Sequence, residues 1–182
     1  MSKDIYCVKD RKDKKYFFSI KTGKRVKTPK NNICLVDKSV YFLPEIKLIY
    51  SQVSSYKATN KFFQSINDII FKIFMKINIS KKSVSNYVDK KFIGEFKIHS
   101  IKFMQTKFYE YQESKKLPLL FDKIKKGKYE SIKFASLLEF IITELCELSF
   151  YECEKRNGKV VNINDLLSSI KDDIELKKII NK

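Results

Sequence analysis

One long stretch of helical periodicity constrains this chain more than any other feature. Residues 134–180 read FASLLEFIITELCELSFYECEKRNGKVVNINDLLSSIKDDIELKKII, with apolar residues at 134, 138, 141, 145 and 148. That spacing places them on one face of a helix. An Asn-Gly pair at 157–158 ends the pattern, two β-like valines follow, and Asn162 or Asn164 can cap a second, shorter helix. The segment predicts two helices whose apolar faces need a partner.

The scarcity of turn-forming residues favours an all-α fold. The 182 residues include only 4 Gly and 3 Pro, which β-rich folds spend on turns, and 43% of the chain is hydrophobic, enough for a folded core. No run of 18 apolar residues is present, and the N-terminus lacks the apolar core of a signal peptide. We therefore expect helices and no membrane association.

The same pattern of helices occurs further upstream. Pro44 suits the first turn of a helix over residues 44–52. Apolar residues at 58, 62, 66, 69, 70, 73, 74, 77, 84, 87 and 88 predict one helix of about thirty residues. Gly94 interrupts it and a polar-aromatic helix follows to Lys116, whereas residues 118–126 predict a short helix ended by Gly127. The chain thus contains two short-long-short helix triplets in tandem.

Residues 1–43 form a separate basic region with a charge balance of +8. Residues 15–20 and 25–27 are strand-like and flank a turn around Gly23. A small β-hairpin and a mobile basic arm both fit this sequence. The predicted regions are therefore a basic N-terminal extension (1–43) and two helical units (44–116 and 117–182).

Three motifs in the C-terminal half resemble a core histone of the two-A type. They are LFDKIKKGKY at 120–129, LLEFIITELCELS at 137–149 and NINDLLSSIKDDIELKKI at 162–179. More loosely, six upstream residues sit as in the central helix of a two-B-type histone: Ser65, Asn67, Asp68, Ile69, Phe71 and Ile73. This order is similar to the fused histone doublets of giant DNA viruses. The resemblance covers roughly residues 44–180 and implies two tandem histone folds paired within one chain.

The charge distribution favours a polyanionic partner. The net charge is +17, with +16 in residues 1–116 and only +1 in residues 117–182. A solvated lysine-rich surface arising from biased codon usage is the simpler alternative. The resemblance implies that paired loops bind DNA phosphates, one group being Ser54, Ser55 and Lys57 with Lys155, Arg156 and Lys159, and the other Lys90 and Lys91 with Lys125, Lys126, Lys128 and Lys133.

Two departures from the family pattern bear on DNA binding. The loop after Gly127 is shorter than in the family, and Val160 stands where the family has an arginine. Only Arg11, Arg25 and Arg156 are present, and lysine lacks the guanidinium fork. We therefore expect DNA wrapping that is weaker and more sensitive to salt than that of cellular histones.

Five carboxylates correspond to members of the acidic patch of the family, and Ile174 replaces a sixth. They are Glu139, Glu144, Glu147, Asp173 and Glu175. The resemblance implies an exposed docking surface for a basic tail or for an arginine-anchored factor. An ordinary solvated helix face is the alternative.

Catalytic signals are absent from the sequence. His99 is the only histidine, and no phosphate-binding Gly-rich loop or nucleophile elbow occurs. The cysteines (Cys7, Cys34, Cys146 and Cys153) follow no metal-binding spacing. We expect a non-enzymatic protein without metal or cofactor.

The resemblance therefore implies a DNA-packaging histone doublet that binds duplex DNA without sequence specificity. It would form a nucleosome-like particle with a second doublet equivalent to the other two core histones. The expected location is the virion and the viral factory or host nucleus. A histone-fold regulatory subunit of a transcription or chromatin complex is the main alternative, and a helical structural protein with no nucleic-acid role is a third.

Overall fold

The computed structural model describes residues 5–9, 15–19, 25–26, 36–37, 41–79, 83–124 and 126–181. Most of these residues are helical, in agreement with the predicted fold class. The helices are α1 (Leu43–Val53), α2 (Asn60–Ile79), α3 (Val84–Lys91), α4 (Gly94–Ser114), α5 (Lys128–Lys155), α6 (Ile163–Asp172) and α7 (Ile174–Asn181). A 3-10 turn, η2, spans Phe121–Lys123, and the short strands β5 (Lys57–Ala58) and β6 (Val160–Val161) lie in two of the loops.

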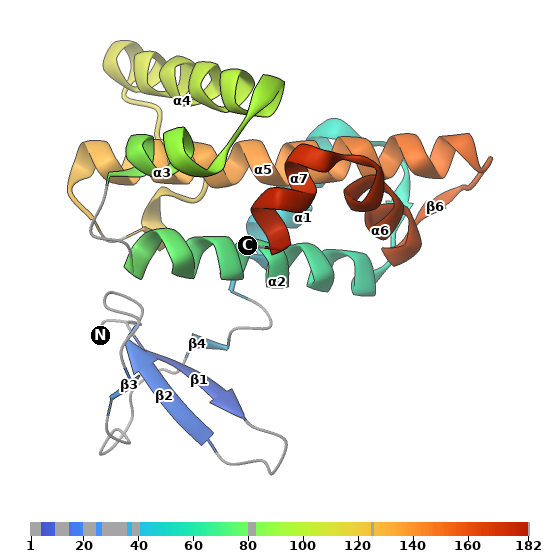
Figure 1. Cartoon of the computed structure of the whole chain (residues 1–182), viewed down its shortest axis with the longest axis horizontal. Helices are drawn as coiled ribbons and strands as arrows, with labels where there is room; N and C mark the ends of the chain where they lie inside the picture. The colour runs from blue at the N-terminus through green and yellow to red at the C-terminus, as the bar shows by residue number, and fades with distance from the viewer. Residues whose placement is uncertain are drawn as a thin grey trace.

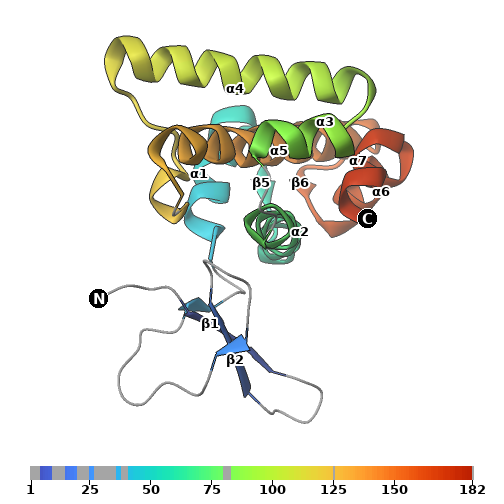
Figure 2. The same ribbon diagram turned by 60° about the vertical axis from the view of Figure 1, so that its left-hand side comes forward.

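Helix α5 is the centre of the helical body. Figures 1 and 2 show α2 along one side of it and α4 along the opposite side, with α6 and α7 beside its C-terminal half. Its buried residues occupy nearly the whole circumference, including Phe134, Leu138, Phe140, Ile141 and Leu145. A helix that is apolar all round belongs inside a fold, so both halves of the chain pack on α5.

Aromatic side chains join the two halves in a single core. Phe74 of α2 stacks on Phe134 of α5 with ring centroids 5.6 Å apart. Phe96 of α4 meets Phe140 edge-on at 5.0 Å. Burying each such ring contributes roughly 1.5–3 kcal/mol, and the buried side chains of both halves form one continuous cluster.

A short parallel ladder also joins the halves. Lys57 and Ala58 of β5 pair with Val160 and Val161 of β6, and the Thr59 N–H donates to the Val161 carbonyl at 3.0 Å. The predicted β-like character of residues 160–161 is confirmed. The ladder brings the loop after α1 against the loop before α6.

The predicted thirty-residue helix is wrong, because the structure has two helices there. Helix α2 ends at Ile79 and α3 begins at Val84, where the Ser83 hydroxyl accepts a hydrogen bond from the Asn86 N–H at 3.3 Å. Serine favours such a cap over a helix interior, because its side chain satisfies a backbone N–H that has no helical partner. The apolar positions on either side of the break keep helical spacing, which hides it in the sequence.

The predicted short helix over residues 118–126 is reduced to the 3-10 turn η2. Side chains of α5 accept hydrogen bonds from the backbone N–H groups of this segment. The Leu120 N–H donates to Glu139 at 3.0 Å, and the Lys126 N–H donates to the Ser131 hydroxyl at 3.1 Å. These bonds compete with helix formation.

The N-terminal extension contains a four-stranded sheet with the order β3-β2-β1-β4. Its strands are β1 (Ile5–Lys9), β2 (Lys15–Ser19), β3 (Arg25–Val26) and β4 (Val36–Asp37). Strands β2 and β3 are antiparallel, so of the two alternatives left open for this region the structure contains the hairpin. Strand β1 adds antiparallel to β2, and β4 adds parallel to β1.

Candidate nucleic-acid interface

The first predicted loop pair is assembled around the β5–β6 ladder. We call the residues Ser54, Ser55, Lys57, Lys155 and Lys159 the β-bridge cluster. Its three lysines are exposed. The Ser54 hydroxyl accepts from the Tyr56 N–H at 3.1 Å, which shapes the turn into β5. Lys57 and Lys159 lie at the ladder, one from each half, whereas the Lys155 ammonium is paired with Glu152 Oε1 at 2.7 Å. Lysines from both halves at one ladder suit phosphate oxygens.

Arg156, predicted beside this cluster, is engaged within the protein. Its Nη2 donates to Asp165 Oδ2 and to the Val160 carbonyl, both at 2.8 Å. Burial acts to raise the pKa of Asp165, but hydrogen bonds from Arg156 and the Asn162 N–H outweigh it and hold that pKa below its usual range. Arg156 therefore fixes the turn between α5 and α6.

The second predicted group is only partly brought together. The N-terminus of α5 faces the beginning of α3, where the Val84 N–H donates to Glu130 Oε2 at 3.1 Å. Lys90 and Lys91 lie in the last turn of α3, at its other end. Their predicted pairing with the lysines near the start of α5 is therefore corrected, because an additional break before α3 places the opposite end of that helix at α5.

The start of α3, where the Val84 N–H meets Glu130 of α5, was missed from the sequence. Residues 80–82, which include Lys81 and Lys82, fall outside the described residues. Ser83 was the signal for this helix start in the sequence. A serine at the N-cap often accepts a hydrogen bond from the backbone N–H three residues later. Lys91 instead lies near Lys72 and Lys76. Burial, followed by the charges of Lys72 and Lys91, lowers the pKa of Lys76.

The lysines near the start of α5 have different surroundings. Lys126 donates to the Ile77 carbonyl at 3.3 Å, and burial lowers its pKa. The exposed Lys128 lies over the Tyr111 ring at 5.0 Å, and its hydrogen bond to Tyr111 raises its pKa. Lys133 is half-buried and lines a pocket. Lys125 lies outside the described residues.

The predicted acidic surface is smaller than expected, because Glu139 is buried. Glu139 is only 6% exposed, and its Oε1 accepts a hydrogen bond from the Leu120 N–H at 3.0 Å. Burial raises the pKa of Glu139. Glu175 is also engaged, because its Oε2 accepts from the Phe96 N–H at 2.7 Å in the first turn of α4. Glu139 is therefore not available as an open docking group, and Glu175 is partly exposed with one of its oxygens engaged.

Three of the predicted carboxylates remain close together. We call Glu144, Glu147 and Asp173 the three-carboxylate cluster. Burial raises the pKa of Glu144, and the charges of Glu147 and Asp173 add to that effect while His99 opposes it. Asp173 has a second role, since its Oδ1 accepts from the Glu175 and Leu176 N–H groups at 2.8 and 2.9 Å and caps α7.

The sequence matches no protein-family model and no curated protein. Functional inference thus rests on the chain's own residues. Within the described parts of the chain, no helix is long and apolar enough to cross a membrane. No group of three or more His, Cys, Asp or Glu side chains there could hold a metal ion. Cys146 and Cys153 are free, buried thiols.

Proposed function

We propose that this chain is a histone doublet that packages duplex DNA, with residues 44–116 and 117–182 forming two paired histone folds. The β5–β6 ladder is the observation that carries the proposal. In a histone-fold pair the loops line up in twos, one from each partner. The ladder joins the loop after a first helix in one half to the loop before a third helix in the other.

The order of the helices supports the same proposal. Helices α1, α2 and α3 form a short-long-short series, and η2, α5 and α6 form a second one with a reduced first member. The segment between the halves contains no Gly/Ser linker, and both Pro118 and Leu120 are buried. This connection suits two units that fold as one body.

The charge of the protein supports a DNA partner. A net charge of +17 and lysines grouped around the ladder favour binding through phosphates rather than bases. Because Arg156 is held by Asp165, lysines are the main cations at the ladder that can bind phosphate. Lysine binds phosphate as a point charge, so the complex should be strongly salt-dependent.

The first test is duplex affinity as a function of salt. The logarithm of affinity should fall linearly with the logarithm of salt, by about 0.9 per neutralised phosphate. The double variant Lys57→Ala/Lys159→Ala should reduce that slope by up to about 1.8. Lys177→Ala/Lys178→Ala removes the same charge from α7, away from the ladder (Figure 1), and should reduce the slope less.

A flat salt dependence, or a strong preference for one DNA sequence, would contradict packaging. Nuclease digestion separates the main alternative. A packaging histone should protect a discrete length of DNA of any sequence, whereas a regulatory subunit should protect none. We propose a second doublet, equivalent to the other two core histones, as the partner that completes the particle, located in the virion and in the viral factory or host nucleus.

The three-carboxylate cluster is the proposed docking site for a basic tail or an arginine-anchored factor. Clustered carboxylates repel one another within about 8–10 Å at physiological salt, and a cationic partner relieves that repulsion. The variant Glu144→Gln/Glu147→Gln/Asp173→Asn keeps an oxygen on the α7 cap. We expect it to abolish binding of a basic histone-tail peptide while leaving duplex affinity unchanged or slightly higher.

A matched control for that variant is Glu113→Gln/Glu154→Gln/Asp122→Asn. These three residues are exposed, and the control removes the same charge elsewhere. Equal loss of peptide binding in both triple variants would show a general charge effect. Unchanged peptide binding in the first variant would leave the cluster as an ordinary solvated surface.

A further inference from the structure

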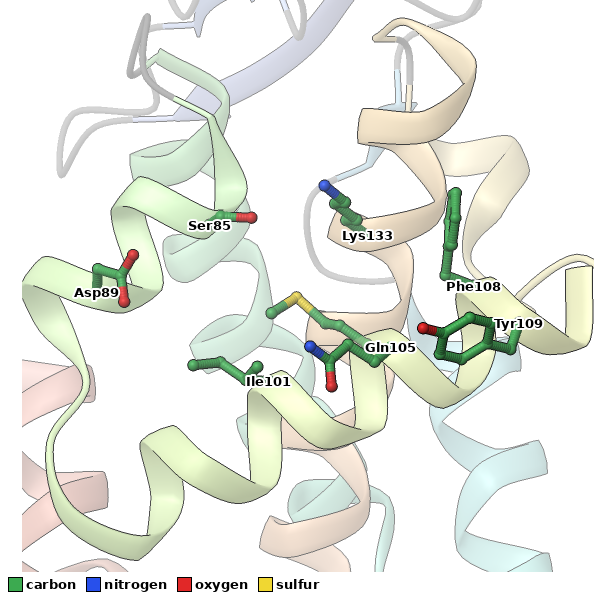
Figure 3. Close-up of a pocket in the computed structure, with 8 residues that line it drawn as sticks. Ser85, Asp89, Ile101, Gln105, Phe108, Tyr109 and Lys133 are labelled. Carbon is green, nitrogen blue, oxygen red and sulfur yellow. The ribbon is translucent and has the colours of Figure 1, made fainter. Parts of the chain in front are cut away.

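A pocket of about 270 Å³ opens between α3, α4 and α5. Figure 3 shows its lining: Ile101, Gln105, Phe108 and Tyr109 come from α4, and Lys133 comes from α5. Pockets that hold drug-sized ligands measure roughly 300–1,000 Å³. This cavity suits one flat heterocycle better than a peptide segment.

We propose that the pocket receives one unpaired base of a bound nucleic acid strand. This inference deepens the proposed DNA binding and rests on it. Phe108 and Tyr109 supply aromatic surface for stacking, and Ile101 supplies an apolar contact. The Gln105 amide can both donate to and accept from the edge of a base. Lys133 supplies a cation for the adjoining phosphate.

The charges at the pocket favour an anionic strand. Asp89 is the carboxylate in the lining, and its Oδ1 is paired with Lys97 at 3.0 Å. That ion pair neutralises Asp89, whereas Lys133 adds positive charge at the other side, on α5. A nucleotide, with a flat apolar base and an anionic phosphate, complements this arrangement.

The surface beside the pocket alternates aromatic rings and lysines. Tyr109 and Tyr129 are 62% and 61% exposed, and Tyr129 lies 5.7 Å from Phe108 between ring centroids. Lys128 lies 5.0 Å above the Tyr111 ring. Exposed aromatic rings interleaved with cations are the usual means of holding single-stranded nucleic acid, since every base has a face on which to stack.

The pocket also lies beside the paired starts of α3 and α5. Ser85, in the first turn of α3, and Lys133, near the start of α5, both line it. The same two helix ends are joined by the hydrogen bond from the Val84 N–H to Glu130. A strand bound at these two helix starts would pass the pocket. Extracting a paired base costs a few kcal/mol, so the pocket should select DNA that is already unpaired.

The test uses the full chain and oligonucleotides that contain one 2-aminopurine, whose fluorescence reports stacking. Three probes are compared: a single strand, its duplex, and an abasic strand of equal charge. We expect 2-aminopurine fluorescence to change on binding of the single strand. Tyr109→Ala should weaken single-strand binding roughly tenfold and alter duplex binding less than twofold. Gln105→Ala should weaken single-strand binding in the same direction.

Tyr151→Ala is the matched control. Tyr151 is 55% exposed and has Lys155 4.6 Å from its ring centre, but it does not line the pocket. The proposal is overturned if Tyr109→Ala and Tyr151→Ala behave alike, or if the abasic strand binds as tightly as the base-containing one. Loss of duplex binding with pocket-dependent single-strand binding intact would instead contradict only the packaging proposal.

Discussion

At the scale of single residues, the backbone decides which carboxylates remain available. Glu139, Glu175 and Asp165 each accept hydrogen bonds from backbone N–H groups at the end of a distant or neighbouring segment. Sequence spacing predicted that the acidic residues of α5 lie near one another, and Glu144 and Glu147 do. It could not predict that η2 would present the Leu120 N–H to Glu139, because that contact depends on how a loop folds back.

Glu139 should therefore affect stability rather than binding. In Glu139→Ala the buried Leu120 N–H loses its acceptor, so the free energy of unfolding should fall by about 1–3 kcal/mol. Glu139→Gln keeps an oxygen and should lose less. Glu147→Ala, at an exposed position of the same helix, should change stability little. Urea unfolding measures all three, and equal effects at 139 and 147 would contradict a buried structural role.

The same variants give a pH signature. The folded pKa of Glu139 is raised above its ordinary value of 4.5. Its contribution to stability is therefore greatest below pH 4.5 and is lost as pH rises through the folded pKa. The stability of Glu139→Gln, measured relative to the wild type, should therefore rise as the pH is raised from acidic to neutral.

At the scale of elements, capping and helix-breaking residues explain which helix boundaries were predictable. Pro44, Gly94, the Asn-Gly pair at 157–158 and Asn162 mark the ends of α1, α4, α5 and α6, and the structure places these ends within one or two residues of the predictions. The division of α2 from α3 was hidden, because Val84 and Val88 continue the apolar stripe. Because the start of α3 at Ser83 was missed, the second predicted loop was placed at Lys90 and Lys91, the far end of α3.

Gly94 offers a test of how α4 is joined to α7. It has φ +56, and a Cβ there would clash with the Glu175 carboxylate. Gly94→Ala should therefore destabilise the protein by about 1–2 kcal/mol from backbone strain alone, and more if Glu175 releases the Phe96 N–H. Thermal unfolding measures the effect.

Gly127 provides the matched control for that substitution. Its φ is −59, and a Cβ would meet no atom within 4 Å. Gly127→Ala should change the free energy of unfolding by less than about 1 kcal/mol, because restriction of the unfolded chain is opposed by the weaker N-capping of alanine at the start of α5. Destabilisation of equal size at both glycines would contradict a specific contact between Gly94 and Glu175.

At the scale of the whole molecule, the central question is whether either half can fold without the other. The sequence predicted two apolar triplets, each lacking a complete core, and the structure places both on α5. It did not predict the sheet order of the N-terminal extension or the pocket under α4. Both depend on contacts between segments that are distant in sequence, for which local periodicity carries no signal.

We expect fragments 1–116 and 117–182 to be unfolded or aggregated when separate and to fold when mixed. Alone, the second fragment would expose the faces of α5 that contact Phe74 and Phe96, and β6 would lose its partner strand. Circular dichroism and size-exclusion chromatography of each fragment and of their mixture measure this. Phe134→Ala should weaken reassembly by about 3–5 kcal/mol, whereas Leu167→Ala, at a residue 57% exposed, should not. A cooperative thermal transition of either fragment as a monomer would show that the halves are independent domains.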